Sequence, residues 1–166
     1  MIKNPLYQEL GQFIVMFQRV EEKLIDLLVL MVDADDEFIR ILANELEYSK
    51  RVKVADVMFN RFVDLRSQLD RTAKERFHKL MAECLELGEL RNDMVHSYYA
   101  HFVNLDSALA LRQKTSKLKA SKGVREVAEK DLSAGSFTLC FNQLSAVHQK
   151  LEDFRLKIID WQCPLE

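Results

Sequence analysis

The chain has 166 residues, a length typical of a single domain, and is 30% charged and 48% hydrophobic. Only four Gly and two Pro are present, too few for an all-β or linker-rich protein. No uncharged apolar run reaches the roughly 18 residues of a membrane span, and the first ten residues lack the layout of a signal peptide. We therefore expect one mostly helical domain over residues 1–166, in the cytoplasm and with no membrane partner.

The first half of the chain predicts three helices, because its apolar residues recur at intervals of three and four, the spacing of one helical face. The first helix is expected over residues 10–32. Asp33 and Asp35 break it, and either can cap a second helix over residues 36–47. Ser49 then offers an N-cap for a third helix, which is either continuous with the second or bent against it.

A fourth helix is expected to open at Thr72, where Thr-Ala-Lys-Glu forms a capping-box pattern, and its apolar stripe continues to Tyr99. Between residues 102 and 130 the helical period fails, apolar and polar residues alternate, and Gly123 suits a turn. We interpret this segment as a short basic β-hairpin or arm. Ser133 then opens a last helix that keeps the helical period to Trp161. The predicted fold class is all-α, an antiparallel bundle of four to five helices with the arm before the last one.

Two charges interrupt the apolar stripes of this bundle. Arg91 falls within the stripe of the fourth helix and Glu21 within that of the first. An unpaired buried charge costs several kcal/mol. We therefore expect either that Glu21 and Arg91 meet, or that Arg91 faces a cleft or a second subunit. Asn92 and His96 lie one turn apart on the stripe edge, and Arg91 lies about 140° around the helix from His96. A site that uses Arg91 and His96 together then needs a cleft or a two-fold dimer.

The six residues Arg-Asn-Asp-Met-Val-His, from Arg91 to His96, resemble the signature of the HEPN superfamily, which lies on a late helix of a small helical bundle. The first helix is similar to that of a bacterial branch in its pattern of Phe17, Val20, Glu21 and Leu24. The resemblance covers most of the chain, although its one sharp motif is six residues long. Many members are metal-independent endoribonucleases of toxin, phage-defence and RNA-processing systems that act as dimers. Others have lost catalysis and only bind RNA or protein.

The resemblance implies that Arg91 and His96 form the catalytic pair and that Asn92 orients them, with Glu21 and Asp93 in support. RNA supplies its own nucleophile, the 2'-hydroxyl, so a base and a cation suffice for cleavage without metal or cofactor. His96 can take the hydroxyl proton near neutral pH, and Arg91 can stabilise the phosphorane. A purely structural alternative is a register-fixing pair between Arg91 and Glu21, with His96 idle near a helix end.

The predicted arm carries six basic residues and no acid between positions 107 and 125: Arg112, Lys114, Lys117, Lys119, Lys122 and Arg125. These residues either contact RNA phosphates or form a solvated edge. Tyr98, beside the motif, either stacks on a base or belongs to the core. The expected partners are RNA, a second copy of the chain, and an antitoxin or another protein. The alternative function is a non-catalytic HEPN-like module that binds RNA or protein, and a third reading is a purely structural bundle.

Overall fold

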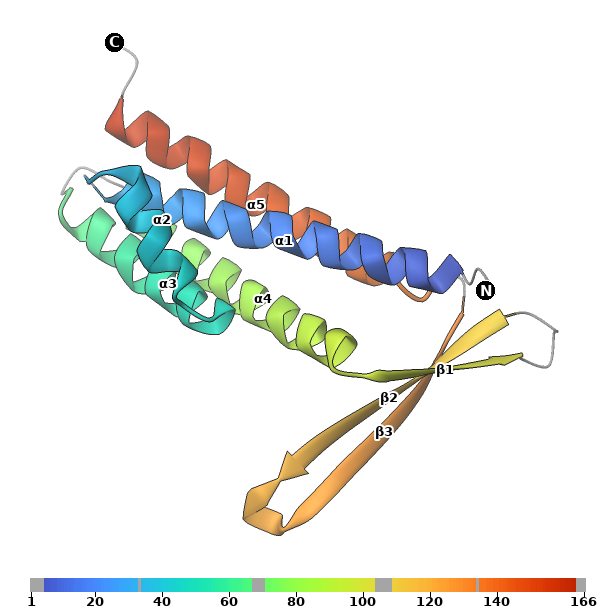
Figure 1. Ribbon diagram of the computed structural model, residues 1–166. Helices are drawn as coiled ribbons and strands as arrows, with labels where there is room; N and C mark the ends of the chain where they lie inside the picture. The colour runs from blue at the N-terminus through green and yellow to red at the C-terminus, as the bar shows by residue number, and fades with distance from the viewer. Residues whose placement is uncertain (1–4, 33, 67–70, 104–108, 134, 164–166) are drawn as a thin grey trace.

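The computed structural model describes residues 5–32, 34–66, 71–103, 109–133 and 135–163 (Figure 1). The helices among them are α1 (Pro5–Met31), α2 (Asp36–Asn44), α3 (Tyr48–Asp64), α4 (Thr72–Val95) and α5 (Thr138–Gln162). The strands are β1 (Tyr98–Val103), β2 (Leu109–Lys119) and β3 (Val124–Leu132), with a 3₁₀ turn at Ala120–Lys122. The protein is therefore predominantly helical, but the all-α prediction is corrected by a three-stranded antiparallel sheet.

The core lies where α1 packs along α5 on one side and against α3 and α4 on the other (Figure 1). Aromatic side chains fill its centre. The rings of Phe59 and Phe77 stack with centroids 4.0 Å apart, and Phe154 meets both edge-on. Burying each such ring stabilises the fold by about 2–3 kcal/mol. The first helix begins earlier than predicted because Leu6, only 1% exposed, also belongs to this core.

Helix starts depend on contacts that a local pattern does not contain. The predicted cap Asp35 is confirmed, since its carboxylate accepts the backbone N–H groups of Glu37 (3.0 Å) and Phe38 (3.3 Å). Asp33 lies outside the described residues. Ser49 is not the cap of α3, because the helix already begins at Tyr48.

Two further predicted caps are also wrong. Thr72, the first residue of the capping-box pattern, lies inside α4, whose N-cap is Arg71. Ser133 does not open α5, because its backbone N–H donates to the hydroxyl of Ser136 (2.9 Å) in a turn. The helix then begins at Thr138. Both helices exist as predicted: α4 begins at Thr72 itself, whereas α5 begins five residues after Ser133.

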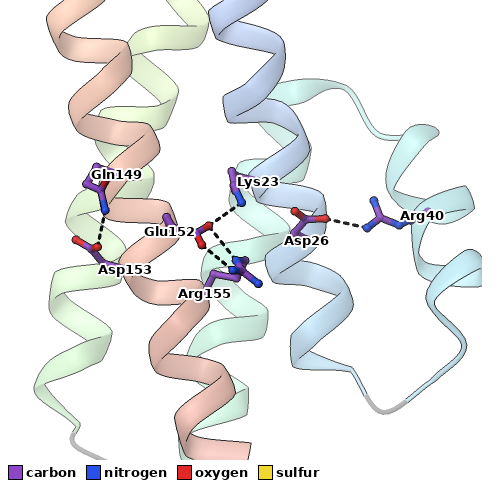
Figure 2. Close-up of polar contacts among 7 residues, drawn as sticks. All are labelled: Lys23, Asp26, Arg40, Gln149, Glu152, Asp153 and Arg155. Atoms are coloured by element: carbon purple, nitrogen blue, oxygen red, sulfur yellow. Dashed lines mark hydrogen bonds and ion pairs between the residues drawn. The ribbon is translucent and has the colours of Figure 1, made fainter.

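Charged side chains join α5 to α1 and, on the neighbouring turn, α1 to α2 (Figure 2). The carboxylate of Glu152 binds both nitrogens of the Arg155 fork and lies 2.6 Å from the ammonium of Lys23 on α1. Hydrogen bonds from Arg155 and then Lys23 lower the pKa of Glu152 to about 2. On the neighbouring turn of α1, Asp26 accepts a bond of 2.8 Å from Arg40. Arg40 thereby holds the short helix α2 against α1.

The strands form an antiparallel sheet in the order β1-β2-β3, with Tyr98 opposite Lys114 and Leu111 opposite Leu132. Leu111 and Leu132 are buried against the helices, while the far half of the β2–β3 hairpin projects away from the bundle (Figure 1). Gly123 adopts a φ of 61° at the tip, so the predicted turn is confirmed. The strands run from residue 98 to 132, beyond the predicted arm of 102–130, because α4 ends at Val95 instead of continuing to Tyr99.

Candidate active site

One cleft of about 630 Å³ holds all three motif residues expected to be catalytic: Arg91, Asn92 and His96. Its walls come from α1, α3 and α4, and they include Glu21 and Lys53. Another groove, of about 430 Å³ between α4 and α5, contains no motif residue and is lined largely by aliphatic side chains. The first cleft therefore combines the predicted catalytic residues with space for a ligand.

Arg91 faces the cleft and not a carboxylate. Its guanidinium carbon lies 5.9 Å from the centre of the Phe17 ring, and one guanidinium nitrogen donates to the side-chain oxygen of Asn92 (3.2 Å). It forms no ion pair with any described residue. Of the two arrangements expected from its position on the stripe, the structure has the cleft, and the pair with Glu21 is wrong. The guanidinium therefore keeps donors available for an anionic ligand.

The carboxylate of Glu21 instead lies 3.8 Å from the guanidinium of Arg51 on α3. Arg51 is 8% exposed and donates to two backbone carbonyls, those of Ala43 and Leu46, at 3.1 Å each. It closes the turn after α2 and fixes the entry into α3. The sequence reasoning missed this residue. Arg51 lies on the buried stripe of α3 beside Val52, so the argument applied to Arg91 would have identified it.

His96 is the C-cap of α4, with its backbone N–H bonded to the carbonyl of Asn92 (3.0 Å) and its side chain exposed. The chain leaves the helix at this residue. Although five helical residues separate the directions of Arg91 and His96 by about 140°, both residues line the same cleft. A single chain brings both to one cleft, so a second subunit is not required for that purpose.

Sheet side chains hold the end of α4. Gln113 on β2 donates to the carbonyl of Asp93 (3.2 Å), and the Tyr99 hydroxyl donates to that of Met94 (2.7 Å). These bonds satisfy carbonyls that a helix end leaves without partners. Burial raises the pKa of Tyr99 to about 12, so its hydroxyl remains a donor at neutral pH. The carboxylate of Asp93 forms an ion pair with Lys117 (2.8 Å), which adds a third tie between α4 and the sheet.

One wall of the cleft forms where the Tyr48 ring on α3 packs against Gly88 on α4. The Tyr48 hydroxyl donates to the carbonyl of Cys84 (2.9 Å), and its ring lies 4.8 Å from that of Phe17. A Cβ on Gly88 would come within 2.6 Å of the Tyr48 ring, so only glycine allows this approach of α3 to α4. Burial raises the pKa of Tyr48 well above its usual range, which excludes it as a base at neutral pH.

The predicted basic arm is largely charge-balanced in three dimensions. Four of its six cations pair with acids: Arg112 with Asp131 (2.8 Å), Lys114 with Glu129 (2.8 Å), Lys117 with Asp93 (2.8 Å) and Lys119 with Glu126 (2.6 Å). Arg125 donates to the hydroxyl of Ser116 (2.6 Å), and Lys122 has no ion pair within the described residues. The acids of β3 just beyond the basic run weaken its positive field. RNA contact by these residues stays a prediction.

Tyr98 is 68% exposed on the outer face of the sheet, opposite Lys114, and therefore does not belong to the core. It does not line the cleft. A base stacked on Tyr98 would therefore lie outside the site that holds Arg91 and His96.

No family model matches the chain, and neither the curated proteins nor the solved structures include a significant match. Within the described ranges, no helix is both long enough and apolar enough to cross a membrane. The same residues contain no group of three His, Cys, Asp or Glu side chains placed to hold a metal ion.

Proposed function

We propose that the protein is a metal-independent endoribonuclease of HEPN type, with its active site in the cleft between α1, α3 and α4. One observation carries the proposal: a single cleft contains an arginine with no carboxylate partner among the described residues, the asparagine bonded to it, and an exposed histidine at a helix end. These are the groups that the superfamily motif implies. The proposed setting is the cytoplasm, in a toxin or phage-defence system.

The chemistry requires only a base and a cation. His96 takes the proton of an RNA 2'-hydroxyl, whose oxygen then attacks the adjacent phosphorus. Arg91 stabilises the negative charge on the phosphorane, and Asn92 keeps the guanidinium oriented. The bond from phosphorus to the 5'-oxygen breaks, and that oxygen takes up a proton from solvent at the open cleft. The products are a 2',3'-cyclic phosphate and a 5'-hydroxyl, and DNA is not cut.

The supporting residues Glu21 and Asp93 do not contact the reacting atoms but hold the elements that form the cleft. Glu21 fixes Arg51, and through it the start of α3, which forms one wall of the cleft. Asp93 binds Lys117 and ties the end of α4 to β2. The cations of the arm remain candidates for phosphate contact. If they bind RNA backbone, the affinity will fall steeply with salt concentration, and reversing their charges will flatten that slope.

A second candidate function is a non-catalytic module that binds RNA or a protein partner such as an antitoxin. The charges of the cleft favour it, because Glu21, Glu47 and Glu89 also line the walls and repel a phosphate chain. Among the described lining residues, Lys53 and Arg91 are the lysine and arginine cations, and His96 is the one histidine. A protein partner that presents both acidic and basic side chains would complement the charges that line this cleft.

Incubating the purified protein with mixed single-stranded RNA and a chelator separates the two functions. We expect cleavage to cyclic-phosphate ends and a loss of about 10²- to 10⁴-fold in His96→Ala or Arg91→Ala. The matched control is His148→Ala, a histidine on α5 outside the cleft, which should cut normally. If the wild type binds RNA but leaves it intact, and His96→Ala binds equally well, the module is correct. Cleavage that persists in His96→Ala would exclude this histidine as the base.

A further inference from the structure

The strand β3 has a free edge. In the order β1-β2-β3 it pairs on one side only, and residues 124–131 are all exposed. The far half of the hairpin projects away from the helices (Figure 1), whereas residues 128–130 and Leu132 line a groove shared with α4 and α5. Among the described strands, β3 pairs only with β2, so its other edge is unpaired. An edge strand presents unpaired backbone N–H and C=O groups, which are a template for a further strand. Its charges must therefore either repel added strands or select one.

Pairing with a second copy of β3 is restricted by backbone geometry. In an antiparallel ladder, two residues that lie opposite must either both direct their N–H and C=O groups at each other or both direct them away. These directions alternate along a strand. A two-fold pair of identical strands can therefore be centred on a residue but not between two residues. This condition leaves few registers for β3.

The register centred on Ala128, the midpoint of β3, is self-complementary. It uses all nine residues and places Val124 opposite Leu132, Arg125 opposite Asp131, Glu126 opposite Lys130, Val127 opposite Glu129 and Ala128 opposite itself. Two-fold symmetry makes each unlike pair occur twice, giving four pairs of opposite charge and no pair of like charge. Centring on Val127 instead places Val124 opposite Lys130 and leaves the end of the strand unpaired. Opposite charges across antiparallel strands stabilise pairing, and like charges oppose it.

We propose that two copies of the chain associate through β3, in the register centred on Ala128, to form a continuous six-stranded antiparallel sheet. Two of the three acids of β3, Glu126 and Asp131, then lie between two cations. Asp131 already binds Arg112 (2.8 Å), and Glu126 binds Lys119 (2.6 Å), on the β2 side. Across the new edge they meet Arg125 and Lys130 of the second copy. The same charges disfavour most other strands, so the edge is selective for its own sequence. This interface does not depend on catalysis in the cleft.

The charge pairs can be broken and then restored. In Lys130→Glu, Glu126 of the second copy meets a carboxylate, and in Glu126→Lys, Lys130 meets an ammonium. Each variant alone should dissociate about 10- to 30-fold more readily than the wild type, because two symmetric pairs change sign. An equimolar mixture restores both pairs and should form a heterodimer of wild-type affinity. The matched control is Lys122→Glu at the hairpin tip, outside the register, which should dimerise normally.

Light scattering supplies the readout, with a wild-type mass of about twice 19.4 kDa expected at tens of micromolar. A crosslink fixes the register independently. In a Cys163→Ser background, which removes the exposed cysteine, Ala128→Cys should form a disulfide between copies, whereas Ser121→Cys at the tip should not. A monomeric wild type without this crosslink overturns the proposal. A dimer that tolerates Lys130→Glu as well as it tolerates Lys122→Glu overturns it too, because the copies then meet at another surface.

Discussion

Replacing Arg51 by Met should destabilise the protein far more than the same change at Arg91. Arg51 is 8% exposed and donates to the carbonyls of Ala43 and Leu46, besides facing the carboxylate of Glu21. Hydrogen bonds from a charged group contribute about 1.5–3 kcal/mol, and breaking a buried ion pair costs about 3–5 kcal/mol. Because the Glu21 side chain remains 28% exposed, we expect a loss of about 3 kcal/mol. The single bond of Arg91 to Asn92, at the surface, is worth less than about 1 kcal/mol.

Urea denaturation followed by circular dichroism measures both variants, with stability read from the midpoint at an unchanged slope. A double-mutant cycle that combines each variant with Glu21→Gln measures the interaction energy between that arginine and Glu21. It should show coupling for Arg51 and none for Arg91. Arg91→Met should also fold normally while losing RNA cleavage. If Arg91→Met costs as much as Arg51→Met, or if it couples to Glu21, the placement of Arg91 in an open cleft is wrong.

Two further predictions concern stability. Gly88→Ala should cost about 1–2 kcal/mol, because the new Cβ meets the Tyr48 ring at 2.6 Å, whereas Gly11→Ala, with nothing within 4 Å, should stabilise α1 by up to about 1 kcal/mol. Thermal unfolding of both variants checks the sign. Arg155 helps to hold the pKa of Glu152 at about 2, so the stability that this carboxylate supplies above its ordinary pKa should be lost as the pH falls from about 5 to 2. Glu152→Gln should remove about 1–2 kcal/mol of that pH dependence, as measured by urea denaturation at several pH values.

The helices were predictable from the sequence because their signal is local. The stripe of α1 is readable from Phe13 to Leu28 without knowledge of what covers it, and each long helix was found in this way. The ends of the helices were less predictable. Tyr98 and Tyr99 fit the helical stripe of α4, but both residues pair with β2 and therefore form the start of strand β1. The periodicity of apolar residues within a short window does not show whether a strand distant in sequence will pair with the end of a helix.

The candidate site was predicted in its residues but not in its contacts. Arg91 and Arg51 both interrupt apolar stripes, and the sequence does not determine which of them reaches Glu21. That choice depends on how α3 and α4 lie against α1. The charge of the arm was misjudged for a similar reason. The basic run is free of acids along the chain, but the hairpin register brings Glu129 opposite Lys114. Segment charge is therefore a poor guide to local field wherever a hairpin folds an acidic strand onto a basic one.

The part of the sheet next to α4 affects the geometry of the cleft, although no described residue of the sheet lines the cleft. The helical hydrogen-bond pattern of α4 ends at His96, whose backbone N–H donates to the carbonyl of Asn92. The carbonyls just before it, those of Asp93 and Met94, accept from Gln113 and Tyr99 of the sheet, and β1 begins at Tyr98. Those bonds fix the backbone at His96, the residue proposed as the base. The sheet therefore fixes the backbone at His96 while the bundle positions Arg91, and the proposed site requires both parts of the fold.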